Sequence, residues 1–153
     1  MNGRRNVTLG CLFVLSTFAS ADGQTTAPVA DESQTQLAQK YINEKLAIWQ
    51  QRLKLTDWHI SVSQVHRTDL KPRTMGGISW DKSKKSAVIR VLDPSDYQLA
   101  FSAALDDMEL TIVHELVHLE LASLPRKEAS RSVEEHAVNG IADALLALDR
   151  RQQ

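Results

Sequence analysis

Cysteine is almost absent from this sequence, which contains Cys11 alone among 153 residues. Cys11 lies in an N-terminal segment that we expect to be removed, so the mature chain would form no disulfide and offer no thiolate to a metal. A chain without thiols suits an oxidising compartment. Any metal site in the mature protein must therefore use histidine and carboxylate ligands.

The sequence also lacks a long hydrophobic run and an excess of either charge. It has 18 Lys+Arg against 19 Asp+Glu. It contains no basic stripe with interleaved aromatic residues, the pattern that would predict nucleic-acid binding. The longest apolar run, residues 7–19, is too short to span a bilayer as a permanent helix. We therefore expect one domain, with no nucleic-acid partner and no membrane span in the mature chain.

The N-terminus has the features of a secretory signal peptide. Arg4 and Arg5 precede the apolar run at 7–19, and Ala19-Ser20-Ala21 matches a small-x-small cleavage pattern. We predict a signal peptide at 1–21 and export to the periplasm or the medium. An uncleaved anchor is the alternative, and the two adjacent arginines leave the export route open between general and twin-arginine secretion.

A polar segment at 22–35 predicts a flexible linker, and the patterned region at 36–150 predicts a single α+β domain. Helical periodicity, strand-like alternation and a charged five-residue hairpin loop mark its elements. We expect an N-terminal helix, a three-stranded mainly antiparallel sheet and two C-terminal helices, at about 35–53, 58–63, 75–80, 86–92, 106–123 and 132–148. The broad apolar face of the last helix is predicted to consist of Val133, Ala137, Ile141, Ala144, Leu145 and Leu148.

The segment 111–119 contains the pattern His-Glu-x-x-His. On a helix His114 and His118 lie one turn apart on one face, where two imidazoles can bind one Zn²⁺ and Glu115 can act on a metal-bound water. Apolar neighbours, and the absence of glycine and proline from 101 to 124, favour a helix here. The alternative is an ordinary helix surface with Glu115 in solvent.

A catalytic zinc site needs a third protein ligand and an open position for water. The extended metzincin pattern is excluded, because Leu124 occupies the place of its third histidine. The remaining candidates are Glu134, Glu135 and His136. We favour Glu135, because Asn139 lies one helical turn later and could orient a zinc-bound histidine through a hydrogen bond.

Two observations keep the choice of third ligand open. Ser132-x-x-Glu135 is also a capping box, in which Glu135 would only satisfy the start of a helix. Glu134 lies near the middle of an apolar stripe, where a carboxylate is costly unless it is paired or binds metal. His136 falls on the polar side of the helix and is predicted to lie on the surface or at a pocket rim.

The motif His114-Glu-Leu-Val-His118, followed by Glu135-x-x-x-Asn139, resembles the compact gluzincin peptidases. Over about 36–148 the chain is more closely similar to the small metallopeptidases with this motif found in phage and bacteria. The resemblance implies a compact zincin-like domain, with Glu135 on the last helix as the third ligand. Asn139 stands where gluzincins have aspartate, which makes the orienting hydrogen bond uncharged.

These features predict a zinc metalloendopeptidase of the exported compartment that acts on peptide or protein substrates. His114, His118 and Glu135 would hold Zn²⁺, and Glu115 would serve as the general base. The alternative is a non-catalytic zinc-binding module in which the same ligands only brace two helices. A metal-free binding protein would require both motifs to be coincidental.

Two further parts of a peptidase site have only weak candidates in the sequence. An edge strand around Ile78 or Val88 could hold an extended peptide by backbone pairing. Tyr97 and His136 are the candidates for donating a hydrogen bond to the oxyanion.

Overall fold

The computed structural model of the protein describes residues 32–124 and 131–152. As predicted, the fold is α+β, with three α-helices, three strands and two 3-10 helices among these residues. The predicted signal peptide and most of the predicted linker lie outside the described residues. The elements follow in the order α1 (Glu32–Arg52), β1 (His59–Val65), η1 (Arg67–Asp69), β2 (Gly76–Asp81), β3 (Ser86–Leu92), η2 (Pro94–Asp96), α2 (Phe101–Leu121) and α3 (Arg131–Arg150).

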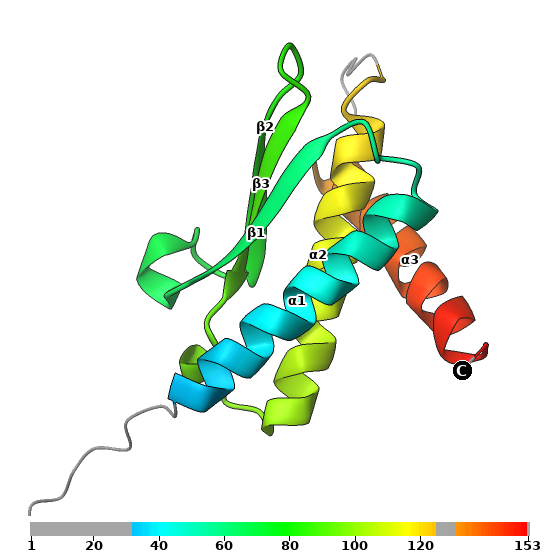
Figure 1. Cartoon of the computed structure of the whole chain (residues 1–153). Coiled ribbons are helices and arrows are strands. Elements are labelled where there is room, and N and C mark those ends of the chain that lie inside the picture. Colours follow the sequence, from blue (N-terminus) through cyan, green and yellow to red (C-terminus); the bar gives the residue numbers. More distant parts are fainter. Residues whose placement is uncertain (1–31, 125–130, 153) are drawn as a thin grey trace, which may run out of the picture.

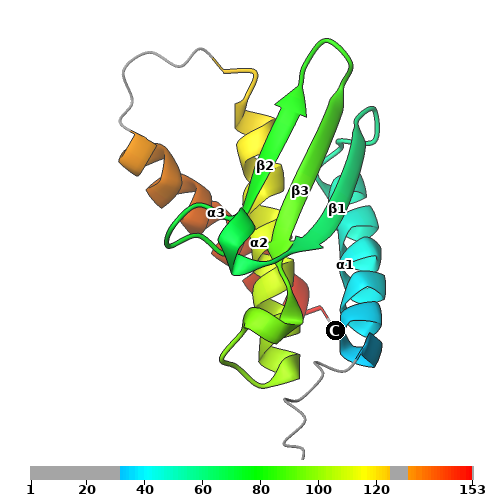
Figure 2. The same ribbon diagram turned by 90° about the vertical axis from the view of Figure 1, so that its left-hand side faces the viewer.

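The three helices lie on one side of the sheet, and α2 occupies the middle of the molecule (Figures 1 and 2). α2 packs against α1, α3, β2 and β3. The central position of α2 explains why most of its surface is apolar, with fully buried Met108, Ile112, Val113 and Leu116. The helix that carries the His-Glu-x-x-His motif is therefore held in place by contacts with both other α-helices and with two strands of the sheet.

The sheet is mixed, so the prediction of a mainly antiparallel sheet was wrong. β3 is the central strand: it pairs in parallel with β1 from His59↔Ser86 to Val65↔Leu92, and antiparallel with β2 from Gly76↔Val91 to Asp81↔Ser86. The residues between β1 and β2 cross the end of the sheet and leave the middle position to β3, the strand with the most buried residues. Residue alternation within a strand carries no information about its direction, which depends on this crossing.

Glu109 of α2 ties α1 to α2 through a buried carboxylate. It accepts hydrogen bonds from Trp49 Nε1 at 2.8 Å and from the Tyr41 hydroxyl at 3.0 Å, and Lys45 Nζ lies 3.0 Å away. A buried carboxylate is tolerated when its oxygens are paired in this way. The three partners lie on α1 at 41, 45 and 49, one turn apart each, so they form a single row facing α2.

α3 buries a different face from the one predicted. Its buried residues are Val138, Ala142, Leu146 and Asp149, whereas Val133, Ile141 and Leu148 of the predicted face are 62%, 43% and 55% exposed. The predicted face was wrong because it was chosen by hydrophobicity alone. The acidic Asp149 is buried because Arg52 of α1 lies 2.7 Å from its carboxylate.

Two helices begin earlier than predicted. α1 begins at Glu32 instead of residue 35, and α2 begins at Phe101 instead of residue 106. α2 extends further toward its N-terminus because Phe101 and Ala104 also pack against the core. No helix in the two described ranges combines the length and apolar character needed to cross a membrane.

Candidate metal centre

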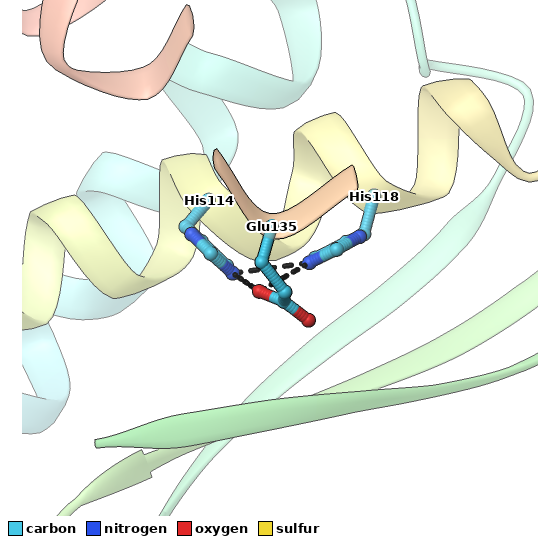
Figure 3. A group of neighbouring side chains, drawn as sticks. All are labelled: His114, His118 and Glu135. Carbon is cyan, nitrogen blue, oxygen red and sulfur yellow. Dashed lines mark hydrogen bonds and ion pairs between the residues drawn. The ribbon is translucent and has the colours of Figure 1, made fainter. Parts of the chain in front are cut away.

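Three side chains from two helices converge on one point (Figure 3). His114 and His118 project from the same face of α2, and Glu135 reaches them from α3. The Nε2 atoms of the two histidines lie 3.1 Å apart, and Oε2 of Glu135 lies 3.3 Å from His114 Nε2 and 3.4 Å from His118 Nε2. Glu135 lies 17 positions after His118 in the sequence, yet the three side chains place ligand-type atoms within hydrogen-bond distance of one another.

The other nitrogen of each ring has an oxygen partner on α3. His114 Nδ1 lies 3.0 Å from Oδ1 of Asn139, and His118 Nδ1 lies 3.2 Å from Oε1 of Glu134. A carboxylate or amide oxygen can only accept, so each Nδ1 must carry the proton and donate it. In the neutral form of each imidazole, Nε2 is then unprotonated, which is the form that binds a metal.

The unprotonated Nε2 atoms and the Glu135 carboxylate form a set of acceptors with no donor among them. Such a set repels itself unless a cation lies between its members. In a tetrahedral zinc site with bonds of about 2.0–2.1 Å, neighbouring ligand atoms are about 3.3 to 3.4 Å apart. The distances of 3.1, 3.3 and 3.4 Å between these atoms fit that spacing, so the group could hold a metal ion.

Burial shifts the pKa of two residues at the centre. Glu115 is 8% exposed, and desolvation raises the pKa of its carboxyl to about 7, against the lowering effect of Arg131, of Arg90 and of His118 when that ring is protonated. The pKa of His114 is lowered, chiefly by burial and then by the repulsion that a protonated His118 would exert on a second imidazolium. A lowered pKa keeps the His114 imidazole neutral and available to a metal.

The centre opens into a cleft of about 650 Å³ between the edge strand β2 and the facing helices α2 and α3. This volume lies in the range of sites that bind small molecules. Ile78 and Trp80 of β2 line one wall, and His114, Glu115 and Glu135 line the other. Of the two predicted edge positions, Ile78 lies on the edge strand β2, whereas Val88 lies on the central strand β3. The prediction for Val88 was therefore wrong.

Gly76 allows β2 to lie close against α2 at this cleft. A Cβ atom at Gly76 would be 2.3 Å from Cγ2 of Thr111 and 2.6 Å from the carbonyl oxygen of Arg90, distances that no side chain can occupy. Thr111 lies one helical turn before Glu115. The missing side chain therefore positions the edge strand beside the candidate centre.

The other residues considered for the site have different positions. α3 includes Ser132, so the capping-box interpretation, which needs Ser132 outside the helix, does not apply. His136 is exposed and does not line the cleft, and the Tyr97 hydroxyl donates to Oδ2 of Asp107 at 2.8 Å.

Arg131 is a residue of the site that the sequence did not indicate. Its Nε lies 3.7 Å from Oε1 of Glu135, one helical turn away.

Comparisons of the chain with protein-family models, with curated proteins and with solved structures found no match.

Proposed function

We propose that this protein is a zinc-dependent metalloendopeptidase of the gluzincin-like type. The observation that supports this most strongly is the convergence of His114 Nε2, His118 Nε2 and Glu135 Oε2, with both Nδ1 protons directed outward to acceptors. A bound Zn²⁺ would act as a Lewis acid, polarising the scissile carbonyl and lowering the pKa of water toward neutrality. The three ligands leave one tetrahedral position for that chemistry, as catalytic zinc sites require.

Glu115 is the general base in this proposal. Its carboxylate would take a proton from the attacking water and pass it to the leaving amine. Burial raises the pKa of Glu115 to about 7, whereas a bound Zn²⁺ beside it would lower the pKa and keep the carboxylate ionised and able to accept a proton. Its place directly after His114 on α2 keeps it beside the metal ligands while leaving it on the wall of the cleft.

The substrate of this proposed peptidase is an extended segment of a peptide or protein. β2 is an edge strand of the described sheet, which is the position at which an extended peptide can add as a further strand. Ile78 and Trp80 line the cleft from this strand and would pack against apolar side chains of the substrate. The signal-like pattern at 1–21 supports a place of action in the periplasm or outside the cell.

Replacing Glu115 by glutamine tests this function directly. Glu115→Gln should keep the zinc content of the wild type and lower hydrolysis of a labelled unfolded protein by roughly 10²- to 10⁴-fold, because only the base is removed. Glu120→Gln is the matched control, since Glu120 is exposed on the same helix. Hydrolysis by Glu115→Gln at the wild-type rate would refute the role of Glu115, and an inactive zinc-loaded wild type would refute the peptidase.

A non-catalytic zinc-binding module is the second candidate function. Three residues of α3, Glu134, Glu135 and Asn139, contact histidines of α2 at this centre. These contacts join the two helices, which is the role that a bracing zinc site would have. A purely bracing zinc site would have no exchangeable position. Binding of a small hydroxamate to the zinc-loaded protein, measured by calorimetry, should occur for the peptidase and not for the bracing module.

A further inference from the structure

α3 carries apolar residues on two opposite faces. The inner face packs against the rest of the molecule through Val138, Ala142 and Leu146. We call the opposite side the outer face of α3; it consists of six exposed small or apolar residues, Val133, Ala137, Gly140, Ile141, Ala144 and Leu148. α3 lies on the far side of α2 from the sheet, at the outside of the molecule (Figure 1).

The outer face differs from an ordinary helix surface. A helix with one packed side normally presents charged and polar residues to water on the other. Here Ile141 and Leu148 are 43% and 55% exposed, and no charged residue interrupts the row between Val133 and Leu148. Isolated exposed apolar side chains are common, but a continuous row along about 22 Å of helix, at 1.5 Å per residue, indicates an interaction surface.

Gly140 supports the same conclusion. Glycine is the least favourable residue in a helix interior apart from proline, and Gly140 lies in the middle of α3. A Cβ atom at this position would meet nothing within 4 Å among residues 32–124 and 131–152, so packing within this part of the chain does not require glycine. The close approach of another backbone would require it.

The spacing of the outer face suits pairing with a copy of itself. Ala137, Ile141, Ala144 and Leu148 follow one another at steps of four, three and four, the pattern of a helix–helix seam. When two α3 helices run antiparallel about a twofold axis between positions 142 and 143, Leu148 lies level with Ala137 of the second copy. Ile141 then lies level with Ala144, so each large side chain is opposite a small one, as close packing requires.

We propose that the outer face of α3 is a self-association surface on which a second copy of this chain docks, with the two α3 helices antiparallel. A twofold pairing needs a surface complementary to itself, and this face is, both in its large–small alternation and in its lack of charge. A stable dimer usually buries about 800 Å² on each partner, which is more than one helix face of this length supplies. We therefore expect a weak dimer that forms as the concentration rises.

Exposed residues of α1 provide matched controls for the test. Ile48 and Leu37 are 42% and 56% exposed, almost the same as Ile141 and Leu148. The test measures molar mass against concentration by sedimentation equilibrium. The wild type and Ile48→Asp/Leu37→Asp should approach twice the chain mass, whereas Ile141→Asp/Leu148→Asp should associate about tenfold or more weakly.

Three outcomes would overturn the proposal. They are a wild type that stays monomeric at every concentration, assemblies that grow beyond the dimer, and equal effects of the two double variants. Circular dichroism of each variant checks that the exposed substitutions leave the fold intact.

Gly140→Ala separates the interface from the stability of the helix. Alanine is a better helix former, so the melting temperature of the monomer should rise by a few degrees. The same methyl group would hold the two backbones apart and weaken the dimer. A Gly140→Ala variant that dimerises as well as the wild type would refute the close approach of the helices.

Discussion

Nδ1 of His118 lies 3.2 Å from Oε1 of Glu134. This contact separates the roles of the two adjacent glutamates that the sequence offered as third ligands. Glu134 accepts a hydrogen bond from Nδ1–H of His118 on the side of the ring away from the centre, whereas Glu135 directs Oε2 to the Nε2 atoms of both histidines. We infer that Glu135 binds the metal and that Glu134 fixes the orientation of His118.

These different roles predict that substitutions at Glu135 and Glu134 will weaken zinc binding to different extents. Glu135→Gln should lose stoichiometric zinc, because a neutral amide replaces a charged ligand. Glu134→Gln should still bind one zinc per chain, with affinity lowered roughly 10- to 100-fold, since removing an orienting partner has that effect in zinc sites. Elemental analysis and competition with a chromophoric chelator measure the two quantities. Loss of zinc chiefly in Glu134→Gln would reverse the assignment.

Asn139 supplies a second prediction at the other ring. Its Oδ1 accepts from His114 Nδ1 at 3.0 Å, as an uncharged partner. Asn139→Ala should weaken zinc binding roughly 10- to 100-fold. Asn139→Asp should bind zinc at least as tightly as the wild type, because a carboxylate makes the ring a more basic ligand. Weaker binding by Asn139→Asp than by Asn139→Ala would show that Asn139 does not orient His114.

The sequence predicted those parts of the centre that depend on one helix at a time. The positions of His114 and His118 follow from a spacing of four on α2, and Glu135 and Asn139 share a face of α3 for the same reason. The contact between Glu134 and His118 could not be predicted, because it depends on how the two helices lie against each other. The sequence indicated only that a carboxylate at Glu134 needed a partner.

The errors in the predicted fold have the same origin. The direction of β1 relative to β3 is set by the crossing after Val65 and not by residues within the strands. The buried face of α3 could not be chosen by hydrophobicity, since both of its faces are apolar and the correct one includes Asp149. Burial of Asp149 depends on Arg52, which lies on a different helix.

The corner between β1 and η2 predicts a pH effect. The pKa of His66 is raised from 6.5 by a hydrogen bond to Asp96, with Nδ1 to Oδ2 at 3.1 Å, and by the charge of that carboxylate. The pKa of Asp96 is lowered, first by the backbone N–H of Arg67 and also by His66. The pair should therefore stabilise the fold between the ordinary pKa values of aspartate and histidine.

The two pKa shifts set opposite limits to this stabilisation. It should be lost as the pH rises through the raised pKa of His66, and as the pH falls through the lowered pKa of Asp96. NMR titration of the His66 ring should give a pKa above 6.5 in the wild type, and Asp96→Asn should bring it back toward 6.5. Asp57→Asn is the control. Asp57 precedes the first residue of β1, whereas His66 follows its last, so this variant should leave the pKa of His66 unchanged. An unshifted His66 in the wild type would contradict the pairing.

The contact of β2 with α2 predicts opposite results for two adjacent glycines. At Gly76 an added Cβ would meet Thr111 and the Arg90 carbonyl, whereas at Gly77 it would meet nothing within 4 Å. Gly76→Ala should therefore lower the free energy of unfolding by about 1–3 kcal/mol, the usual cost of overpacking. Gly77→Ala should leave it nearly unchanged, and urea unfolding of both variants measures the difference.

Peptide hydrolysis by the same two variants connects this contact to the site. Because β2 forms one wall of the cleft, moving it away from Thr111 should displace the edge that we propose holds the substrate. Hydrolysis should then fall in Gly76→Ala while zinc content stays that of the wild type, since His114, His118 and Glu135 lie on the two helices. If Gly76→Ala is as stable and as active as Gly77→Ala, the close approach of β2 to α2 does not position the cleft.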